Sequence, residues 1–307
     1  MSTSTLHIVC AIDDDFKLPL SVMLLSLFET NKKHKLKIHL LSANLSDENI
    51  IFFENLTISR KQEFRFYQLD LDTFKEFPVD KRISFAAYYR LVAPEVLDSS
   101  IDRYIYFDAD IIIERDLFEL WNTDLKGNII GAIHDIFAIR DKYYVTHNID
   151  HQHLYFNSGV LLVDTKLWIK FNATHKIAKY ITYNKKLCQF HDQDGLNVIL
   201  HDKRLPLIPE WNQQIGIYVI NQELLCDIFG CDNFKRALYN PAVVHFNGNE
   251  KPWWYLCGHP YKQKFLDYLK KAGLSTKYKD VSLINFIKLW RYRVFGWQHV
   301  NKRIYNP

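Results

Sequence analysis

The chain has 307 residues, of which 48% are apolar and 15% aromatic, and this is enough to bury one large hydrophobic core. Its formal net charge is only +4 at pH 7, which for this length argues against a nucleic-acid-binding protein. The first residues are polar and carry no signal-peptide pattern, and no apolar run approaches the roughly 18 residues of a membrane span. We therefore expect a cytoplasmic protein with no nucleic-acid partner.

The five cysteines show no metal-binding pattern, because no two of them have CxxC spacing. Cys226 and Cys231 are close enough in the sequence to form a disulfide bond. Reduced thiols are the simpler expectation for a cytoplasmic protein.

Short apolar runs alternate with helical segments along the first two-thirds of the chain. Strands are predicted at residues 6–12, 36–41, 64–68, 103–107, 129–133 and 159–164. Helices are predicted at residues 18–30, from Ser46 onward, 88–97 with an interruption near Pro94, 166–184 and 193–200. This alternation is typical of an α/β fold with a mostly parallel central sheet flanked by helices. The first strand is followed by three aspartates and not by GxGxxG, so a dinucleotide-binding fold is not indicated.

The sequence changes character near residue 261, so we predict a catalytic domain over residues 1–260 and a helical C-terminal segment over 261–307. Residues 283–305 are basic and aromatic and contain no Asp or Glu. Such a segment suits the surface of an anionic membrane, and a terminal helix packed on the domain is the alternative. In the membrane case the protein would be peripheral on the inner face of the cell membrane. Deletion of residues 283–307 would then weaken liposome binding but spare transfer to a soluble acceptor.

Two carboxylates follow the apolar strand 103–107, in the sequence Asp108-Ala109-Asp110. Side chains at positions i and i+2 of an extended segment point the same way. At about 5 Å and an effective dielectric near 20, two carboxylates repel by roughly 3 kcal/mol, and a hard divalent cation removes this cost. A solvated turn is the alternative for an isolated DxD, so this motif indicates a metal site only together with others.

His245 ends an apolar run and is followed by a glycine-containing loop, a pattern that suits a third metal ligand. A hydrogen-bonded structural histidine is the alternative. Lys251 lies in the same loop and can hold a phosphate as a point charge. A further polar cluster, residues 191–197 (HDQDGLN), lies at a predicted helix start, where Asp and Asn also serve as caps.

Six segments in this order resemble glycosyltransferase family 8, and in particular its bacterial lipopolysaccharide and lipooligosaccharide galactosyl- and glucosyltransferases. They are AIDDD at 11–15, AYYRL at 87–91, YFDAD at 106–110, YFNSGV at 155–160, HDQD at 191–194, and HFNG at 245–248 with KPW at 251–253. Each motif is modest, but the ordered set is specific. The resemblance implies a GT-A type nucleotide-sugar-binding fold and a retaining enzyme that transfers galactose or glucose from a UDP-sugar to a glycan or glycolipid acceptor.

The resemblance also implies roles for individual residues. Asp108, Asp110 and His245 would bind Mn²⁺, with Mg²⁺ as the alternative. The nucleotide would be contacted by Ala11, Ile12 and Asp13 at uridine, Asp15 near the ribose, Ala109, and Gly248 with Lys251 at the diphosphate. Arg90 would contact the sugar and phosphate side of the donor. The sugar would be faced by Asn157, Ser158, Asp192 and Gln193, with Asp135 near the sugar and the acceptor.

Two positions depart from the family pattern, which often has Ala where Ser158 stands and Asn where Asp15 stands. Both replacements are small and polar, and they bear on sugar preference and ribose contacts. For catalysis, Gln193 occupies the position that faces the anomeric carbon, Asp192 is the alternative nucleophile, and Asp135 is the third candidate. An amide is a poor nucleophile, so we expect same-face attack by the acceptor in place of a double displacement.

Three other functions fit parts of this pattern. A nucleotidyltransferase also uses paired carboxylates and a divalent metal, but it would carry a basic, glycine-rich loop where this chain has three aspartates. A non-catalytic sugar-binding module would not need a metal, Arg90 and Lys251 together. A family member that glycosylates a protein or itself is the third alternative.

Overall fold

The computed structural model describes residues 5–75, 77–78, 85–150 and 152–297. The chain forms two units and passes between them several times. The first unit contains Met1–Lys17, Lys32–Ala109 and Leu117–Leu207, and the second contains Leu18–Asn31, Asp110–Asp116 and Ile208–Pro307. This division leaves the domain boundary at residue 260 a prediction. The predicted membrane segment ends with residues 298–307, which include Lys302 and Arg303. These residues lie outside the described part of the chain.

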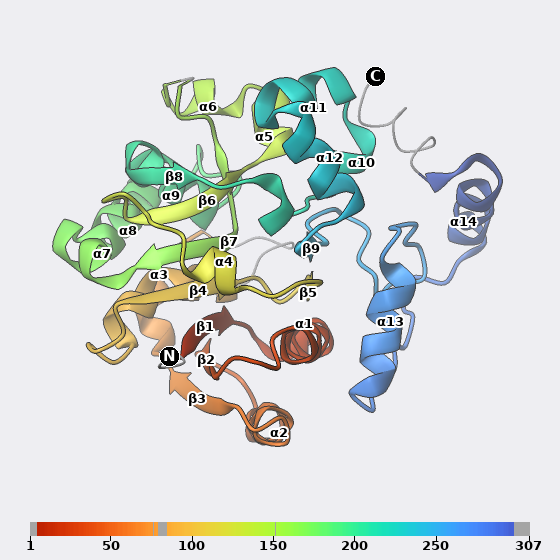
Figure 1. The fold of residues 1–307 in the computed structure, drawn as a ribbon, viewed down its shortest axis with the longest axis horizontal. Coiled ribbons are helices and arrows are strands. Elements are labelled where there is room, and N and C mark those ends of the chain that lie inside the picture. Colours follow the sequence, from red (N-terminus) through yellow and green to blue (C-terminus); the bar gives the residue numbers. More distant parts are fainter. Residues whose placement is uncertain (1–4, 76, 79–84, 151, 298–307) are drawn as a thin grey trace. The chain divides into compact units, whose positions relative to one another are not determined.

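A seven-stranded sheet forms the centre of the first unit, in the order β3-β2-β1-β4-β7-β6-β8 (Figure 1). Strand β7 runs antiparallel to both of its neighbours, and the other neighbouring pairs of this sheet are parallel. The predicted mostly parallel sheet is therefore confirmed. The strands are β1 Leu6–Ala11, β2 Leu36–Ser42, β3 Glu63–Gln68, β4 Arg103–Phe107, β6 Ile130–His134, β7 Phe156–Asp164 and β8 Arg204–Pro206.

The sheet brings polar residues from distant parts of the sequence to one edge. Strands β1 and β4 are parallel neighbours, with Ile8 opposite Ile105. Their apolar residues are buried, and each strand ends where charged residues begin, at Asp13 and at Asp108. Since the carboxyl ends of parallel strands meet at the same edge, both aspartates leave the sheet on the same side.

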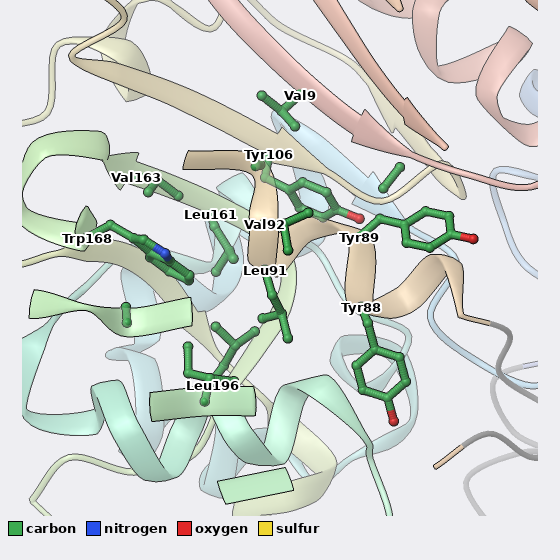
Figure 2. Packing of buried hydrophobic residues seen from close by; sticks show 14 of the residues in the cluster. Val9, Tyr88, Tyr89, Leu91, Val92, Tyr106, Leu161, Val163, Trp168 and Leu196 are labelled. Carbon is green, nitrogen blue, oxygen red and sulfur yellow. The ribbon is translucent and has the colours of Figure 1, made fainter. Parts of the chain in front are cut away.

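Helices pack on this sheet through a large apolar cluster. Helix α3, Ala86–Val96, lies against β1 and β2 and against α7, α8 and α9. Figure 2 shows Leu91 and Val92 of α3 among Tyr106 of β4, Leu161 of β7 and other buried side chains of this cluster. The remaining helices of this unit are α2 Asp47–Ile58, α4 Phe118–Trp121, α5 Ile136–Arg140, α6 Tyr143–Thr146, α7 Thr165–Phe171, α8 Ala173–Tyr183 and α9 Asp192–Leu200.

Two helix predictions need correction. The single helix expected at 166–184 is divided at Asn172, which adopts a left-handed conformation with φ of 55°. Asn tolerates this conformation better than most residues, so the chain can change direction there. Helix α3 is not interrupted at Pro94 but continues to Val96, two residues beyond it. Proline removes the N–H bond to the carbonyl four residues earlier, and the helix ends soon after this loss.

The second unit contains a two-stranded antiparallel sheet and mostly helices. Strand β5, Ile111–Ile113, pairs with β9, Val243–His245. Almost all of α1 belongs to this unit, and its Ser26 hydroxyl accepts a hydrogen bond from the Ile113 amide at 2.9 Å. The helices are α1 Lys17–Thr30, α10 Gly216–Val219, α11 Gln222–Phe229, α12 Cys231–Tyr239, α13 Lys262–Lys271 and α14 Leu283–Phe295. Short 3₁₀ turns occur in the two units at Asp14–Phe16, Leu71–Phe74, His201–Lys203 and Pro209–Trp211.

The expectation of reduced thiols is wrong for one pair of cysteines. Cys226 and Cys231 form a disulfide bond. Gly230, with φ of 79°, turns the chain between α11 and α12, and this turn brings the two α-carbons to 4.2 Å. Cys10, Cys188 and Cys257 are free and buried. Within the described residues, no helix combines the length and apolar character required to cross a bilayer.

Candidate active site

Arg90 connects two of the predicted site carboxylates in the first unit. Its side chain is 8% exposed, and its Nη2 lies 2.8 Å from Oδ1 of Asp108. Its Nε lies 3.1 Å from Oδ2 of Asp192, and its guanidinium stacks over the Tyr106 ring at 4.5 Å. Tyr106 in turn donates a hydrogen bond to Asp108 Oδ1 at 3.0 Å. The middle of α3, the end of β4 and the start of α9 thus meet at one buried cation.

Burial and charge oppose each other at this cluster. Burial by itself lowers the pKa of Arg90, but the two carboxylates outweigh it, so the guanidinium stays charged. Burial raises the pKa of Asp192 to about 6, Arg90 opposes this rise and Asp108 adds to it. The Asp192 carboxyl group therefore holds a proton more readily than an exposed aspartate does.

Gln193 is held by a second buried network. Its Oε1 accepts hydrogen bonds from the Ser158 amide at 3.0 Å and from Asn157 Nδ2 at 3.2 Å. Its Nε2 donates to Oδ2 of Asp135 at 3.2 Å. Asp135 also caps α5, because its Oδ1 accepts from the Ala138 amide. The structure therefore brings together Asp135, Asn157, Ser158 and Gln193, and their role around the sugar stays a prediction.

Residues that sequence reasoning did not single out fix α9 on β7. Asn197 pairs with both backbone groups of Phe156, at 2.7 and 2.8 Å. Asp194 is fully buried and accepts a hydrogen bond from the Tyr155 hydroxyl, and its Oδ1 lies 3.1 Å from Nε2 of His147. Asp194 and Asn197 belong to the polar run 191–197, so the signal was present, but their partners lie far away in the sequence.

Asp110, His245 and Lys251 form the corresponding cluster in the second unit. Oδ1 of Asp110 lies 3.3 Å from Nε2 of His245, and its Oδ2 lies 2.7 Å from Nζ of Lys251. Lys251 also donates to the Phe246 carbonyl at 2.7 Å. These three side chains lie together because β5 pairs with β9. The pairing places Ile111 opposite His245, and the Phe246 amide donates a hydrogen bond to the Asp110 carbonyl.

The charge state of this cluster suits a cation. Burial favours the neutral form of Asp110, but Lys251 and His245 outweigh it and hold the pKa of that carboxyl well below its usual range. His245 Nδ1 lies 2.9 Å from Oδ1 of Asn212. An amide oxygen only accepts, so Nδ1 donates to Asn212, and Nε2 is the ring nitrogen that faces Asp110. A carboxylate oxygen and an imidazole nitrogen are atoms that can hold a divalent ion.

The nucleotide-side residues follow β1. Ala11 and Ile12 are buried, and Asp13 lines a cavity of about 360 Å³ in the first unit. The other lining residues are Asn44, Leu71, Asp72, Lys75, Phe85 and Tyr89. Asp15 is exposed and does not line this cavity. Asp14 has a structural role, since its Oδ1 accepts hydrogen bonds from Ser46 and Asn49 at the start of α2.

Two further predicted residues are small and lie in tightly packed places. Ala109 is buried and is the last residue of the first unit before the chain enters the second. A Cβ atom at Gly248 would lie 2.7 Å from Ile215 Cδ1, so a larger residue there would require the Ile215 side chain to shift.

Comparison with known proteins agrees with this geometry. The family described as "Glycosyl transferase family 8" matches residues 7–257. General stress protein A of Bacillus subtilis (strain 168) is 30% identical over 275 residues, covering 88% of this chain and 95% of that protein. The lipopolysaccharide 1,2-glucosyltransferase of Escherichia coli (strain K12) is 26% identical over 307 residues, covering 97% of this chain and 87% of that protein. The structure of galactosyltransferase LgtC with donor and acceptor sugar analogues has a TM-score of 0.79 at 24% identity, covering 92% of this chain and all of that one. The predicted GT-A type fold is confirmed by this likeness.

Proposed function

The chain belongs to glycosyl transferase family 8, and from this premise we propose that it is a retaining, Mn²⁺-dependent enzyme that transfers galactose or glucose from a UDP-sugar to a glycan or glycolipid acceptor. A relative that spans almost the whole chain is named as a lipopolysaccharide glucosyltransferase, which supports an acceptor in lipopolysaccharide or a related cell-surface glycan. The observation that carries the proposal is Asp110, ionised and in contact with both His245 and Lys251.

Asp108, Asp110 and His245 are the proposed metal ligands. Asp110 and His245 already face each other, and Asp108 is two residues away along the chain, so its α-carbon lies within about 7 Å of that of Asp110. Asn212 orients the imidazole as outer-shell partners of metal-bound histidines do. A divalent cation bound here would neutralise charge on a leaving diphosphate.

Lys251 is proposed to hold the diphosphate. Its ammonium contacts Asp110 Oδ2 and the Phe246 carbonyl, and it is about one-fifth exposed. A phosphate oxygen is a better partner for this ammonium than a neutral carbonyl, because the phosphate adds attraction between opposite charges. Gly248, three residues earlier in the same loop, lets the backbone approach.

The cavity beside Asp13 is proposed to hold the uracil and part of the ribose. Its volume of about 360 Å³ falls within the size range of small-molecule sites. Phe85 and Tyr89 supply aromatic rings, and Asp13 supplies an acceptor for an imide N–H. Ala11, Ile12 and Ala109 would line the nucleotide path from there, with the exposed Asp15 near the ribose.

The network around Gln193 supports same-face attack. The Gln193 amide is bound on both sides, by Ser158 and Asn157 at oxygen and by Asp135 at nitrogen, which orients it but does not make it nucleophilic. In the proposed step the bond from the anomeric carbon to the UDP oxygen breaks. The acceptor oxygen then bonds that carbon on the same face, and the acceptor proton passes to the leaving phosphate oxygen. Arg90 holds Asp192 in an ion pair, so a nucleophilic Asp192 is the less favoured alternative.

Peripheral contact with an anionic membrane is proposed for α14. Seven large apolar residues of this helix are exposed, and it carries basic but no acidic residues. An apolar and basic helical surface suits a layer of anionic lipid headgroups. The exposed apolar residues are Leu283, Ile284, Phe286, Ile287, Trp290, Val294 and Phe295.

Release of UDP from a panel of UDP-sugars tests the proposed reaction. Incubation with Mn²⁺ should release UDP from UDP-galactose or UDP-glucose slowly without acceptor and faster with a lipopolysaccharide core glycan. Release of pyrophosphate would indicate a nucleotidyltransferase, and UDP binding without any turnover a sugar-binding module. A mass increase of the protein by one hexose would indicate self-glycosylation.

A further inference from the structure

The loop of residues 246–258, which carries Lys251, is tied to the C-terminal segment through Glu250. Oε1 of Glu250 accepts a hydrogen bond from the Tyr292 hydroxyl of α14 at 2.5 Å. Oε2 accepts from the Trp297 indole nitrogen at 3.1 Å and from the Gly258 amide at 3.2 Å. All of these residues belong to the second unit, and Glu250 directly precedes Lys251 in the chain.

A second carboxylate ties the same loop from the other end of the segment. Asp280 lies just before α14, and its side chain accepts hydrogen bonds from the amides of Tyr255 and Leu256 at 2.7 and 2.9 Å. Asn285 in the first turn of α14 donates to the Asp280 carbonyl at 2.7 Å. The loop is therefore held at Glu250 and at residues 255–256 by one C-terminal segment.

The two faces of α14 differ in their exposure to solvent. Tyr292 and Trp297 are each 7% exposed, whereas most of the helix faces solvent. Trp297 also packs so closely on the loop that a Cβ atom at Gly258 would lie 1.8 Å from its Cδ1. The few buried residues of the segment are thus the ones that contact the loop.

We propose that residues 280–297 are part of the donor site, because Tyr292 and Trp297 hold Glu250 and so position Lys251 for the diphosphate. This inference rests on the proposed function and deepens it. A loop freed at Glu250 samples more conformations, and binding a phosphate then requires ordering it again. The expectation that deletion of residues 283–307 spares transfer to a soluble acceptor is therefore replaced. The deletion removes both donors to Glu250 and should weaken donor binding as well.

Titration of the full chain with UDP in the presence of Mn²⁺ tests this proposal. Tyr292→Phe removes one hydroxyl, Trp297→Phe removes one N–H, and Tyr239→Phe is the matched control, because Tyr239 is 77% exposed in the same unit. Each of the first two variants should raise the Kd for UDP about three- to tenfold and raise KM for the UDP-sugar more than it lowers kcat. Amide hydrogen exchange over residues 246–258 should become faster, while the control matches the wild type.

The outcomes separate the two proposals. If the wild type binds UDP and both variants bind it within twofold of the wild-type Kd, the positioning role is wrong and the proposed function stands. If the wild type itself binds no UDP with Mn²⁺, the proposed function falls, and the positioning role falls with it. If Tyr292→Phe does not fold, Trp297→Phe and the exchange rates decide.

Discussion

Oδ1 of Asn212 lies 2.9 Å from Nδ1 of His245, and this contact turns the other imidazole nitrogen towards Asp110. Asn212 and His245 come from segments 33 residues apart, brought together because the Gln213 amide bonds the Val243 carbonyl and the His245 amide bonds the Gln213 carbonyl. Orientation of a ligating histidine by a second residue typically contributes one to two orders of magnitude to metal affinity.

Replacement of Asn212 should therefore weaken metal binding without removing a ligand. We expect Asn212→Ala to raise the Kd for Mn²⁺ about 10- to 100-fold, measured as free Mn²⁺ by electron paramagnetic resonance. Asn240→Ala, at an exposed position of the same unit, is the control. Equal Mn²⁺ affinity in both variants would show that the Asn212 contact is only structural.

The metal ligands and Gln193 should respond differently to substitution. Asp108→Asn and Asp110→Asn each remove a charged ligand, and we expect them to lower kcat at least about 1000-fold. Gln193→Ala loses an orienting amide but no nucleophile, so it should retain measurable transfer, about 10- to 100-fold below the wild type. Complete loss of transfer in Gln193→Ala, together with a glycosyl-enzyme adduct trapped in the wild type, would contradict same-face attack.

Replacement of Arg90 by lysine should strongly reduce activity. Its guanidinium reaches Asp108 and Asp192 with different nitrogens and also donates to the Ser158 carbonyl at 2.7 Å. A lysine offers one point charge and cannot reproduce this fork. We expect Arg90→Lys to lower kcat/KM at least about 100-fold while the melting temperature stays within a few degrees. A kcat/KM near that of the wild type would refute this role.

Stability should fall at mildly acidic pH because of buried neutral histidines. Burial lowers the pKa of His39 to about 3, with His7 and nearby cations adding to the effect. An unfolded histidine titrates near pH 6.5, so between pH 6.5 and 3 the unfolded chain binds more protons than the folded one. The stability that the buried, neutral His39 contributes is therefore present above pH 6.5 and is lost as the pH falls towards 3.

Urea unfolding at pH 7.5 and 5.5 checks this sign. Between pH 7.5 and 5.5, the free energy of unfolding of His39→Gln should fall by about 1.4 kcal/mol less than that of the wild type. The reason is that the variant has one titrating group fewer. His175→Gln is the comparison, since His175 is exposed. The same loss of unfolding free energy in all three proteins would contradict the assignment.

The disulfide bond between Cys226 and Cys231 should contribute modestly to stability. It closes a short loop across the α11–α12 turn, and loop-closure entropy for this length is worth about 2 kcal/mol. Cys226→Ala should lower the free energy of unfolding by roughly that amount under oxidising conditions. Under full reduction the variant and the wild type should become nearly equal.

Exposed residues of α14 should govern lipid binding, and those against the loop should not. Trp290 and Phe286 are 54% and 57% exposed. Their double replacement by serine should reduce sedimentation with vesicles rich in phosphatidylglycerol several-fold and leave the Kd for UDP unchanged. Unchanged sedimentation would refute a membrane role for α14.

The sequence was sufficient for features that depend on local pattern. Apolar runs such as 103–107 are buried parallel strands, and polar residues directly after them, such as Asp108, fall at the sheet edge. Contacts between residues far apart in the sequence could not be predicted, because no local pattern marks them. Asp194 with His147 is one case, and Glu250 with Tyr292 is another. The break at Asn172 was missed because apolar spacing continues across it.

The central claim is that Asp110 and His245, with Asp108, hold the cation on which the donor's diphosphate binds. Calorimetric titration of UDP with and without Mn²⁺, on the wild type and on His245→Ala, tests it most directly. We expect UDP to bind at least about tenfold more tightly with Mn²⁺ in the wild type, and Mn²⁺ to have no effect in the variant. Equal UDP affinity with and without Mn²⁺ in the wild type would contradict it.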